Sequence, residues 1–234
     1  PIVLGVLCRV AGFLFAFITS ILLARLLGPG QFGQYAFLLS VVEILTIIAL
    51  FGTPALITRE VAAGVAKEAF PEVKGLLIWA RRNTFLIGSA AAFFCFVFFV
   101  GTANRQIENI PIFFLGLIFS LTIIDSLSRQ INSALLSLDK VIFSQLCSEV
   151  FLPGLFFLLI ISSAILGPER QNLAIIIGIL FISRSVLLLF TSIKVKHYLP
   201  VEVKAARPEW DRKKWLKSAI PLMGIGTLMI INTR

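Results

Sequence analysis

The sequence predicts an all-α fold: a polytopic membrane helix bundle with six complete transmembrane helices and the start of a seventh. Of the 234 residues, 58% are hydrophobic and only 14% are charged, whereas about a quarter of the residues in a soluble domain are charged. The apolar runs are long enough to cross a bilayer, which takes about 20 residues. Helices are predicted because backbone groups in lipid must be paired within their own segment, and a barrel strand would show about ten alternating residues. This composition excludes a soluble enzyme, a disordered chain, a collagen and a disulfide scaffold.

The predicted spans follow one another with short connections. The first runs over Ile2–Leu27 and the second over Gln34–Ile57. Between them Gly28-Pro29-Gly30 ends the first helix, since proline lacks an N–H and glycine accepts left-handed dihedral angles. The later spans are predicted at Asn83–Val100, Pro111–Leu136, Val141–Leu166 and Leu173–Ile193, and the seventh opens near Trp215. Pro111 suits a first helical turn, and Gly167-Pro168 closes the fifth span. Pro54 and Pro153-Gly154 lie inside spans and predict kinks.

The basic residues predict the orientation of the chain. The net charge of +9 would favour nucleic acid in a soluble protein, but here the positive charges lie in alternate connections. Fourteen basic residues flank one side of the predicted spans: Arg59, Lys67, Lys74, Arg81, Arg82, Lys140, Lys194, Lys196, Lys204, Arg207, Arg212, Lys213, Lys214 and Lys217. Only Arg105 and Arg170 lie in the other connections. Connections rich in lysine and arginine remain on the cytoplasmic side of a membrane, so the N-terminus is predicted to be cytoplasmic. The protein itself is predicted to lie in the inner (cytoplasmic) membrane of the cell. The basic connector 198–214 is predicted to lie on anionic lipid, with a partner site as the alternative.

Signatures of catalysis or metal binding are missing from the sequence. Cys8, Cys95 and Cys147 lie inside apolar runs without a CxxC spacing, and their odd number argues against a disulfide framework. His197 is the single histidine, so a histidine metal site is not expected. No nucleophile with a base, phosphate loop or metal-ligand spacing occurs. We therefore expect no cofactor, no metal and no enzymatic activity.

Ionisable residues at membrane depth are the candidate functional groups, because each costs about 2.5–3.5 kcal/mol at the bilayer centre on insertion scales. The basic candidates are Arg9, Arg25, Arg129 and Arg184, of which Arg184 lies deepest. The acidic candidates are Glu43, Asp125 and Glu149. The four deepest groups, namely Glu43, Asp125, Glu149 and Arg184, are predicted to point into the bundle or into a wet cavity. Arg9 and Arg25 lie near span ends, where they can instead extend toward the interface.

The fourth span carries the clearest polar pattern. Asp125 and Arg129 are four residues apart, so they are predicted to form an ion pair on one helix face. Ser128 and Asn132 continue that face, and Gln145, Ser148 and Glu149 form a similar stripe on the fifth span. The two stripes could line an aqueous path or could form hydrogen bonds between buried helices.

Two runs of residues resemble a known family. Ala24-Arg25-Leu26-Leu27-Gly28-Pro29-Gly30-Gln31-Phe32-Gly33-Gln34-Tyr35 is similar to the first hairpin of polysaccharide-biosynthesis flippases, which belong to the multidrug, oligosaccharidyl-lipid and polysaccharide exporter superfamily. Phe51-Gly52-Thr53-Pro54-Ala55-Leu56-Ile57-Thr58-Arg59-Glu60 resembles the end of the second helix of these proteins. The resemblance implies two lobes of helices around a central cavity. Residues 1–197 would then be the N-terminal six-helix lobe, 198–214 the cytoplasmic connector, and 215–234 the truncated start of the second lobe.

The resemblance also implies a function. Members of this family move lipid-linked oligosaccharide or polysaccharide precursors, carried on a polyprenyl diphosphate, from the cytoplasmic to the outer leaflet by alternating access, for lipopolysaccharide or exopolysaccharide export. Arg9, Arg25, Arg129 and Arg184 would bind the diphosphate. Glu43, Asp125 and Glu149 would carry H⁺ or Na⁺, or balance the arginines. Three alternatives remain open: a cation-coupled small-molecule exporter, a membrane-embedded polysaccharide polymerase or ligase, and a non-catalytic membrane assembly protein.

Overall fold

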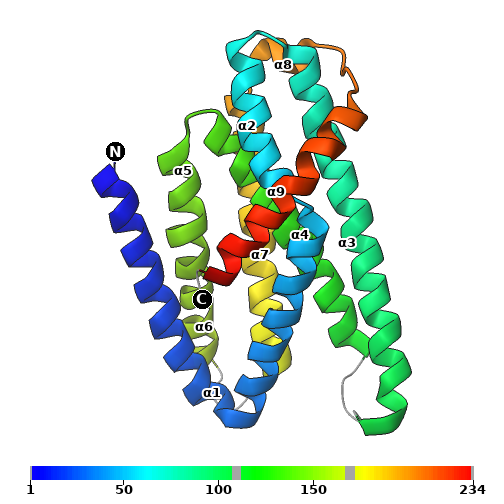
Figure 1. The fold of residues 1–234 in the computed structure, drawn as a ribbon. Helices are drawn as coiled ribbons and strands as arrows, with labels where there is room; N and C mark the ends of the chain where they lie inside the picture. The colour runs from blue at the N-terminus through cyan, green and yellow to red at the C-terminus, as the bar shows by residue number, and fades with distance from the viewer. Residues whose placement is uncertain (1, 107–111, 167–171, 233–234) are drawn as a thin grey trace.

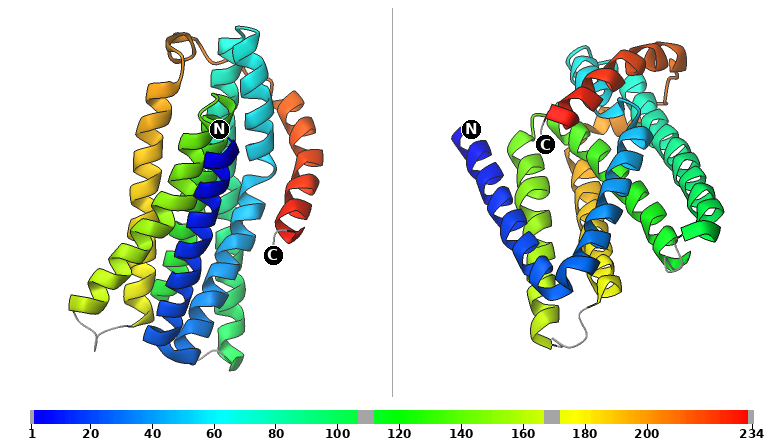
Figure 2. Two further views of the ribbon diagram at one scale, coloured as in Figure 1. Left: turned by 90° about the vertical axis from the view of Figure 1, so that its left-hand side faces the viewer. Right: turned by 60° about the horizontal axis from the view of Figure 1, so that its bottom comes forward.

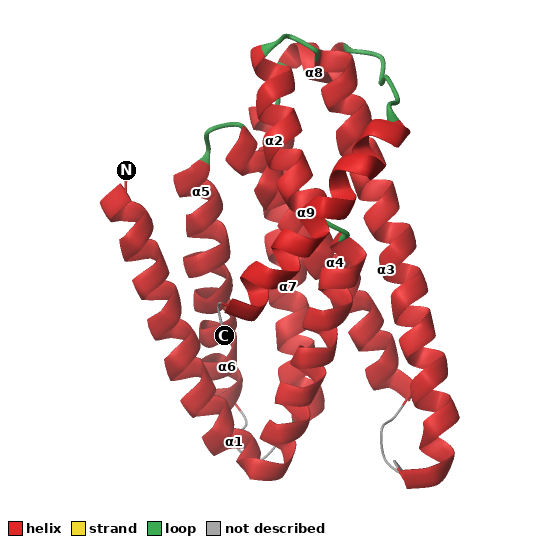
Figure 3. Cartoon of the chain, in the orientation of Figure 1, coloured by secondary structure: helices red, strands yellow, loops and turns green. Residues whose placement is uncertain are grey.

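The computed structural model describes residues 2–106, 112–166 and 172–232, and in these ranges every regular element is a helix (Figure 3). The elements are α1 (Ile2–Leu50), α2 (Thr53–Ala66), α3 (Phe70–Gln106), α4 (Ile112–Ser137), α5 (Val141–Gln145), the π-helix η1 (Leu146–Phe151), α6 (Leu152–Leu166), α7 (Leu173–Tyr198), α8 (Val201–Ala205) and α9 (Arg212–Asn232). The predicted all-α class is therefore confirmed. Pro111, Gly167, Pro168 and Arg170 lie outside the described residues, and so does the side chain of Arg105.

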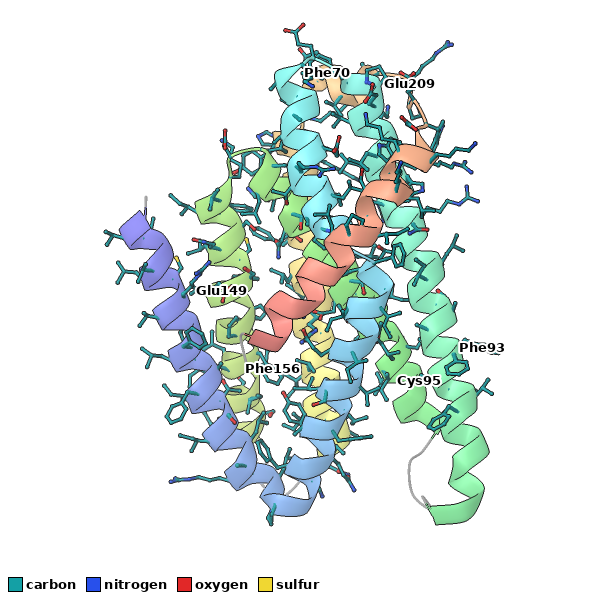
Figure 4. The ribbon with its side chains drawn as sticks, in the orientation of Figure 1. Phe70, Phe93, Cys95, Glu149, Phe156 and Glu209 are labelled. Atoms are coloured by element: carbon teal, nitrogen blue, oxygen red, sulfur yellow. The ribbon has the colours of Figure 1, made fainter. Side chains whose placement is uncertain are left out.

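The chain runs up and down the bundle (Figure 1). Its six passes in the described residues are α1 before Gly28, α1 after Gly28 continued by α2, then α3, α4, the α5–η1–α6 segment and α7. α9 then crosses α2 obliquely on the outside of the bundle (Figure 2). Large apolar side chains face outward, as Phe93 does on α3 (Figure 4). Cys95, two residues further along α3, instead packs against the apolar interior (Figure 4). An apolar outer surface on a helical bundle is what lipid requires.

Within the described residues, three helical stretches are long and apolar enough to cross a membrane: Val3–Leu50, Val141–Ile165 and Leu173–Tyr198. The first of them holds two passes, because α1 folds back at Gly28. α3 and α4 are not among these stretches, so the count of six membrane spans remains a prediction. The protein is nevertheless a multi-pass membrane protein.

The fold-back of α1 rests on one residue. Gly28 has φ 68° and ψ 171°, a conformation open to glycine because it has no Cβ. Helical geometry resumes directly afterwards, with Pro29 in the first turn of the second half. The connection is therefore tighter than the gap that the sequence predicted between Leu27 and Gln34.

A second break lies near the predicted kink at Pro54. α1 ends at Leu50, and Phe51 and Gly52 follow with φ 45° and 72°. Pro54 then occupies the first turn of α2, where its missing N–H leaves no helical hydrogen bond unmade. α2 continues well beyond the predicted end of the second span at Ile57, and α3 begins at Phe70, so most of the basic segment 59–82 is helical rather than a loop. Pro153 is the second residue of α6, one residue after the π-helix η1, and a π-helical turn is one of the features that bend helices.

The interior consists of two apolar clusters stacked along the bundle. The first cluster joins both halves of α1 with α4, α6 and α7, and includes Leu23, Leu45, Leu121, Phe156 and Ile176. The second joins α2, α3, α4, α8 and α9, and includes Leu56, Val61, Leu76, Trp79, Ala134 and Trp215. The polar residues of α4 from Asp125 to Gln130 lie between the parts of that helix that enter the two clusters. A polar band therefore separates the two apolar layers near the α1–α2 break.

The basic connector 198–214 packs against the beginning of α3. The Lys74 ammonium donates to the backbone carbonyls of Lys204 and Ala206 at 2.6 and 2.8 Å. The amide of Glu209 donates to the carbonyl of Pro71 at 3.0 Å, and Phe70 and Glu209 share this end of the molecule (Figure 4). Val203 in α8 is buried. The connector is thus held by protein contacts, whereas most of its basic side chains stay exposed; its contact with anionic lipid remains a prediction.

Candidate functional site

A chain of four charged residues crosses the middle of the bundle. Arg129 on α4 donates from Nη2 to both carboxylate oxygens of Glu43 on α1, each at 2.8 Å. The same nitrogen lies 3.4 Å from Oδ2 of Asp125, one turn earlier on α4. The ion pair predicted from the i, i+4 spacing is therefore present, but the closer partner of Arg129 comes from another helix.

Arg184 on α7 joins this chain through Asp125. Its Nη1 forms an ion pair with Oδ1 of Asp125. Both side chains are largely buried, at 17% and 11% exposure. Asp125 thus lies between two guanidinium groups, and the order along the network is Glu43, Arg129, Asp125, Arg184. Two acidic and two basic groups cancel in charge, which is how a bundle can hold ionised groups away from water.

An amide next to this network connects three helices. Gln130 on α4 donates to Thr53 Oγ1 at 2.9 Å, to the Ala80 carbonyl at 3.0 Å and to Thr84 Oγ1. Thr53 is the first residue of α2, and its hydroxyl also donates to the carbonyl of Leu50 at 2.6 Å. The break between α1 and α2 is therefore held by a buried hydrogen-bond cluster. Such clusters specify one arrangement because each unpaired member would be costly.

A pocket opens beside Arg184. Its volume is about 430 Å³, and it is bounded by both halves of α1, α6 and α7. Polar lining groups are Thr19, Ser20, Tyr35, Ser40 and Arg184, and the rest of the lining is apolar. Phe156 forms part of this lining on α6 (Figure 4). The pocket therefore offers one guanidinium and several hydroxyls within an apolar wall.

Three of the predicted site residues stand apart from the network. Arg9 and Arg25 on the first half of α1 are exposed, and no ion pair involves them in the described part of the chain. Glu149 lies on η1, next to the first half of α1 (Figure 4). A Cβ added to Gly12 would lie 2.2 Å from the carbonyl oxygen of Glu149. That glycine therefore permits the two backbones to approach closely.

The serines of the predicted polar stripes bond mainly to backbone. Ser128 donates to the Ile124 carbonyl at 2.8 Å, and Ser148 to the Ser144 carbonyl at 3.0 Å, each within one helix. Ser144 lies 3.4 Å from the Asn132 carbonyl and links α5 to α4. The hydroxyls of Ser128 and Ser148 are thus satisfied by backbone one turn away, and both the aqueous path and the interhelical hydrogen bonds stay predictions for the two stripes.

Sequence reasoning identified all four network residues and part of their pairing. It matched Asp125 with Arg129 from their spacing, and it placed Arg184 either in a cavity or against an acid such as Asp125 or Glu149. The Glu43–Arg129 pair was not predicted, because it depends on helix packing between residues 86 positions apart. Gln130 was missed altogether. Its signal was a long polar amide next to Arg129 in a span, a residue type that joins helices in membranes.

The arrangement offers a site that can bind an anion. Among the described residues, no group of three or more His, Cys, Asp or Glu side chains is placed to hold a metal ion. Arg184 can donate several hydrogen bonds in a fixed plane, as phosphate recognition requires. The apolar wall around it would suit a hydrocarbon chain or the flat face of a sugar ring.

A family profile described as "Polysaccharide biosynthesis protein" matches residues 2–233. Neither the curated proteins nor the solved structures contain a match.

Proposed function

The chain belongs to the polysaccharide biosynthesis protein family, and from this premise we propose that it works in a membrane flippase for lipid-linked oligosaccharide or polysaccharide precursors. The proposed cargo is a sugar carried on a polyprenyl diphosphate, which is moved from the cytoplasmic to the outer leaflet by alternating access. Family membership supports a general role in flipping or exporting such precursors. The specific cargo, the direction and the mechanism are our proposal.

The observation that carries the proposal is the position of Arg184 at the edge of the 430 Å³ pocket. A diphosphate headgroup is anionic, and a guanidinium binds phosphate oxygens by charge-assisted hydrogen bonds. Ser20 and Tyr35 add hydroxyls to the same lining. The pocket would accept the headgroup and the adjoining part of the cargo.

The remaining roles follow from the same proposal. The protein would lie in the inner membrane with its N-terminus in the cytoplasm, which fits the gathering of basic residues at the end of the bundle that holds the α2–α3 turn and the connector (Figure 1). Its exposed lysines and arginines there would contact anionic lipid. Arg9 and Arg25 would meet the headgroup only as it enters or leaves, since neither lines the pocket. H⁺ or Na⁺ is the proposed coupling ion, carried by Glu43, Asp125 or Glu149.

Cargo export in cells tests the proposal. Arg184→Lys and Arg184→Gln are expressed in a strain that lacks a flippase of this class, and export is normalised to the amount of folded protein in the membrane. Lysine should keep part of the activity as a point charge, whereas glutamine should lose most of it. Arg59→Gln is the matched control, because Arg59 is exposed on α2 and pairs with the adjacent Glu60. Full export per molecule with Arg184→Gln would contradict the proposed role of Arg184.

A small-molecule exporter of the same superfamily is the second candidate. Its supporting observation is that the four network charges cancel, which leaves no excess positive charge at the centre of the bundle. Export of cationic dyes by the wild type, with no export of lipid-linked sugar, would favour it.

A further inference from the structure

Arg184 is already paired before any cargo arrives. Its Nη1 lies against Oδ1 of Asp125, and α4 packs on α7 along much of their length. Because both side chains are largely buried, water screens this pair only weakly. The pocket therefore contains a cation whose charge is largely neutralised from the α4 side.

The guanidinium of Arg184 lines the pocket and keeps donors that no described protein group uses. In the described part of the chain, Nε makes no hydrogen bond, and Nη1 makes only the ion pair with Asp125; both nitrogens are buried. Two hydroxyls of the pocket lining are already occupied: Thr19 donates to the Phe15 carbonyl at 2.6 Å and Ser40 to the Ala36 carbonyl at 3.0 Å. An anion entering the pocket would therefore find Arg184 as its main charged donor.

Asp125 has a second cationic partner, Arg129. Its second oxygen lies 3.4 Å from Arg129, which is itself held at 2.8 Å by Glu43. The charged and titratable groups placed around Arg184 and Asp125 in the described residues are Glu43 and Tyr35 on α1, and Arg129 on α4. If Asp125 releases Arg184, it keeps a cationic partner. In the described part of the chain, Arg184 forms an ion pair with Asp125 alone.

We infer that Asp125 is an internal competitor for Arg184 that lowers the affinity of the pocket for an anionic headgroup. This inference rests on the proposed function. A buried guanidinium without a counter-ion would bind a diphosphate tightly, because the ligand would relieve the cost of an unpaired buried charge. A carrier has to release its cargo as well as bind it. Asp125 favours release of the cargo because its ion pair with Arg184 forms again as the headgroup leaves.

A binding measurement on the whole purified protein in lipid nanodiscs tests the inference. The probes are inorganic pyrophosphate and geranyl diphosphate. Asp125→Asn should raise the affinity for both about tenfold or more, since it removes a charge in direct contact with Arg184. Asp125→Glu retains the competing carboxylate and should stay within about threefold of the wild type.

Glu43→Gln is the matched control. It changes the net charge of the network by the same amount but removes no contact to Arg184. It should therefore raise the affinity much less than Asp125→Asn does. Equal effects of the two substitutions would mean that long-range charge, not competition, sets the affinity. An unchanged or weakened affinity in Asp125→Asn would mean that Asp125 orients Arg184, and either result overturns the inference.

A second measurement needs no substitution. The sequence contains three aspartates, and the other two, Asp139 and Asp211, are exposed. In protein labelled with ¹³C-carboxyl aspartate, pyrophosphate should shift one infrared carboxylate band as Asp125 leaves Arg184. Binding without a band shift overturns the inference and leaves the proposed function intact. Failure of both probes to bind any variant overturns the proposed function and the inference with it.

Discussion

At the scale of single residues, four of the membrane-depth charges are held in one network of shared ion pairs. Arg129 contacts two carboxylates, and Asp125 contacts two guanidinium groups. Only the two end members, Glu43 and Arg184, have a single ion-pair partner in the network. Removing one partner of a buried pair is costly mainly because the other charge is left behind. The two distances to Arg129 indicate that Glu43, at 2.8 Å, is the stronger partner and Asp125, at 3.4 Å, the weaker.

Two double-mutant cycles check this ranking. One combines Glu43→Gln with Arg129→Gln, and the other combines Asp125→Asn with Arg129→Gln. The first cycle should give a coupling energy of about 1 kcal/mol or more, and the second a smaller one, because the closer contact is lost only in the first. Thermal unfolding in detergent, at one protein concentration, gives the relative stabilities. A larger coupling for Asp125 than for Glu43 would show that the short contact is not the dominant one.

At the scale of helical elements, residues with positive φ lie at four places: the break within α1, the break between α1 and α2, and the turns after α2 and α4. Gly28 and Gly52 adopt positive φ at the two breaks, while Glu68 and Asp139 adopt φ 58° and 59° at the helix ends. The amides of Ala69 and Lys140 close these ends by donating to the carbonyls of Gly64 and Leu135. Both ends therefore have the 6→1 hydrogen bond of a Schellman turn, although glycine is the residue that suits the position best.

The fold-back of α1 gives a matched pair of glycine substitutions. A Cβ added at Gly28 or at Gly30 would meet no atom within 4 Å, so neither substitution creates a clash. Only Gly28 has a positive φ, at 68°. Gly28→Ala should therefore destabilise the protein by about 1–3 kcal/mol through backbone strain alone. Gly30→Ala should leave the stability unchanged or raise it slightly, since alanine is the better helix residue.

Melting temperatures of the two variants and the wild type, measured in the same detergent, test this difference in stability. Equal melting temperatures would show that the turn can form without a left-handed residue at position 28. A loss of stability in Gly30→Ala alone would indicate that the second glycine, and not the first, is the one that the hairpin needs.

At the scale of the whole molecule, the sequence predicted the class of fold because hydropathy reports directly on lipid exposure. The Gly28-Pro29-Gly30 turn was predictable for a local reason, since glycine and proline restrict the backbone wherever they occur. The reach of α2 to Ala66 and the early start of α3 at Phe70 were not, because the charged residues of the segment 59–82 led to its assignment as a loop between spans. Arg184 was expected to face a cavity or an acid such as Asp125 or Glu149, but the choice of Asp125 depends on which faces of α4 and α7 meet, which no periodicity within one helix reveals.

Site-directed labelling tests the predicted orientation. In a background without Cys8, Cys95 and Cys147, a single cysteine replaces either Lys67, at the α2–α3 turn, or Gln34, close to the fold-back of α1. Both native residues are exposed, and the α2–α3 turn and the fold-back of α1 lie at opposite ends of the bundle (Figure 1). An impermeant maleimide added to intact cells should label Gln34→Cys and spare Lys67→Cys, because the basic end is expected to face the cytoplasm. The reverse pattern would invert the topology.

The order of the charges along the chain also bears on how the protein enters the bilayer during synthesis. Glu43 is made first, and α4 then arrives carrying an acid and a base that can neutralise each other within one turn. Arg184 comes last, in the strongly apolar α7 that can carry an arginine into lipid on its own hydropathy. Its counter-ion Asp125 is by then in place on α4. For both arginines of the network, Arg129 and Arg184, an acidic partner has therefore already been translated when the arginine enters the membrane.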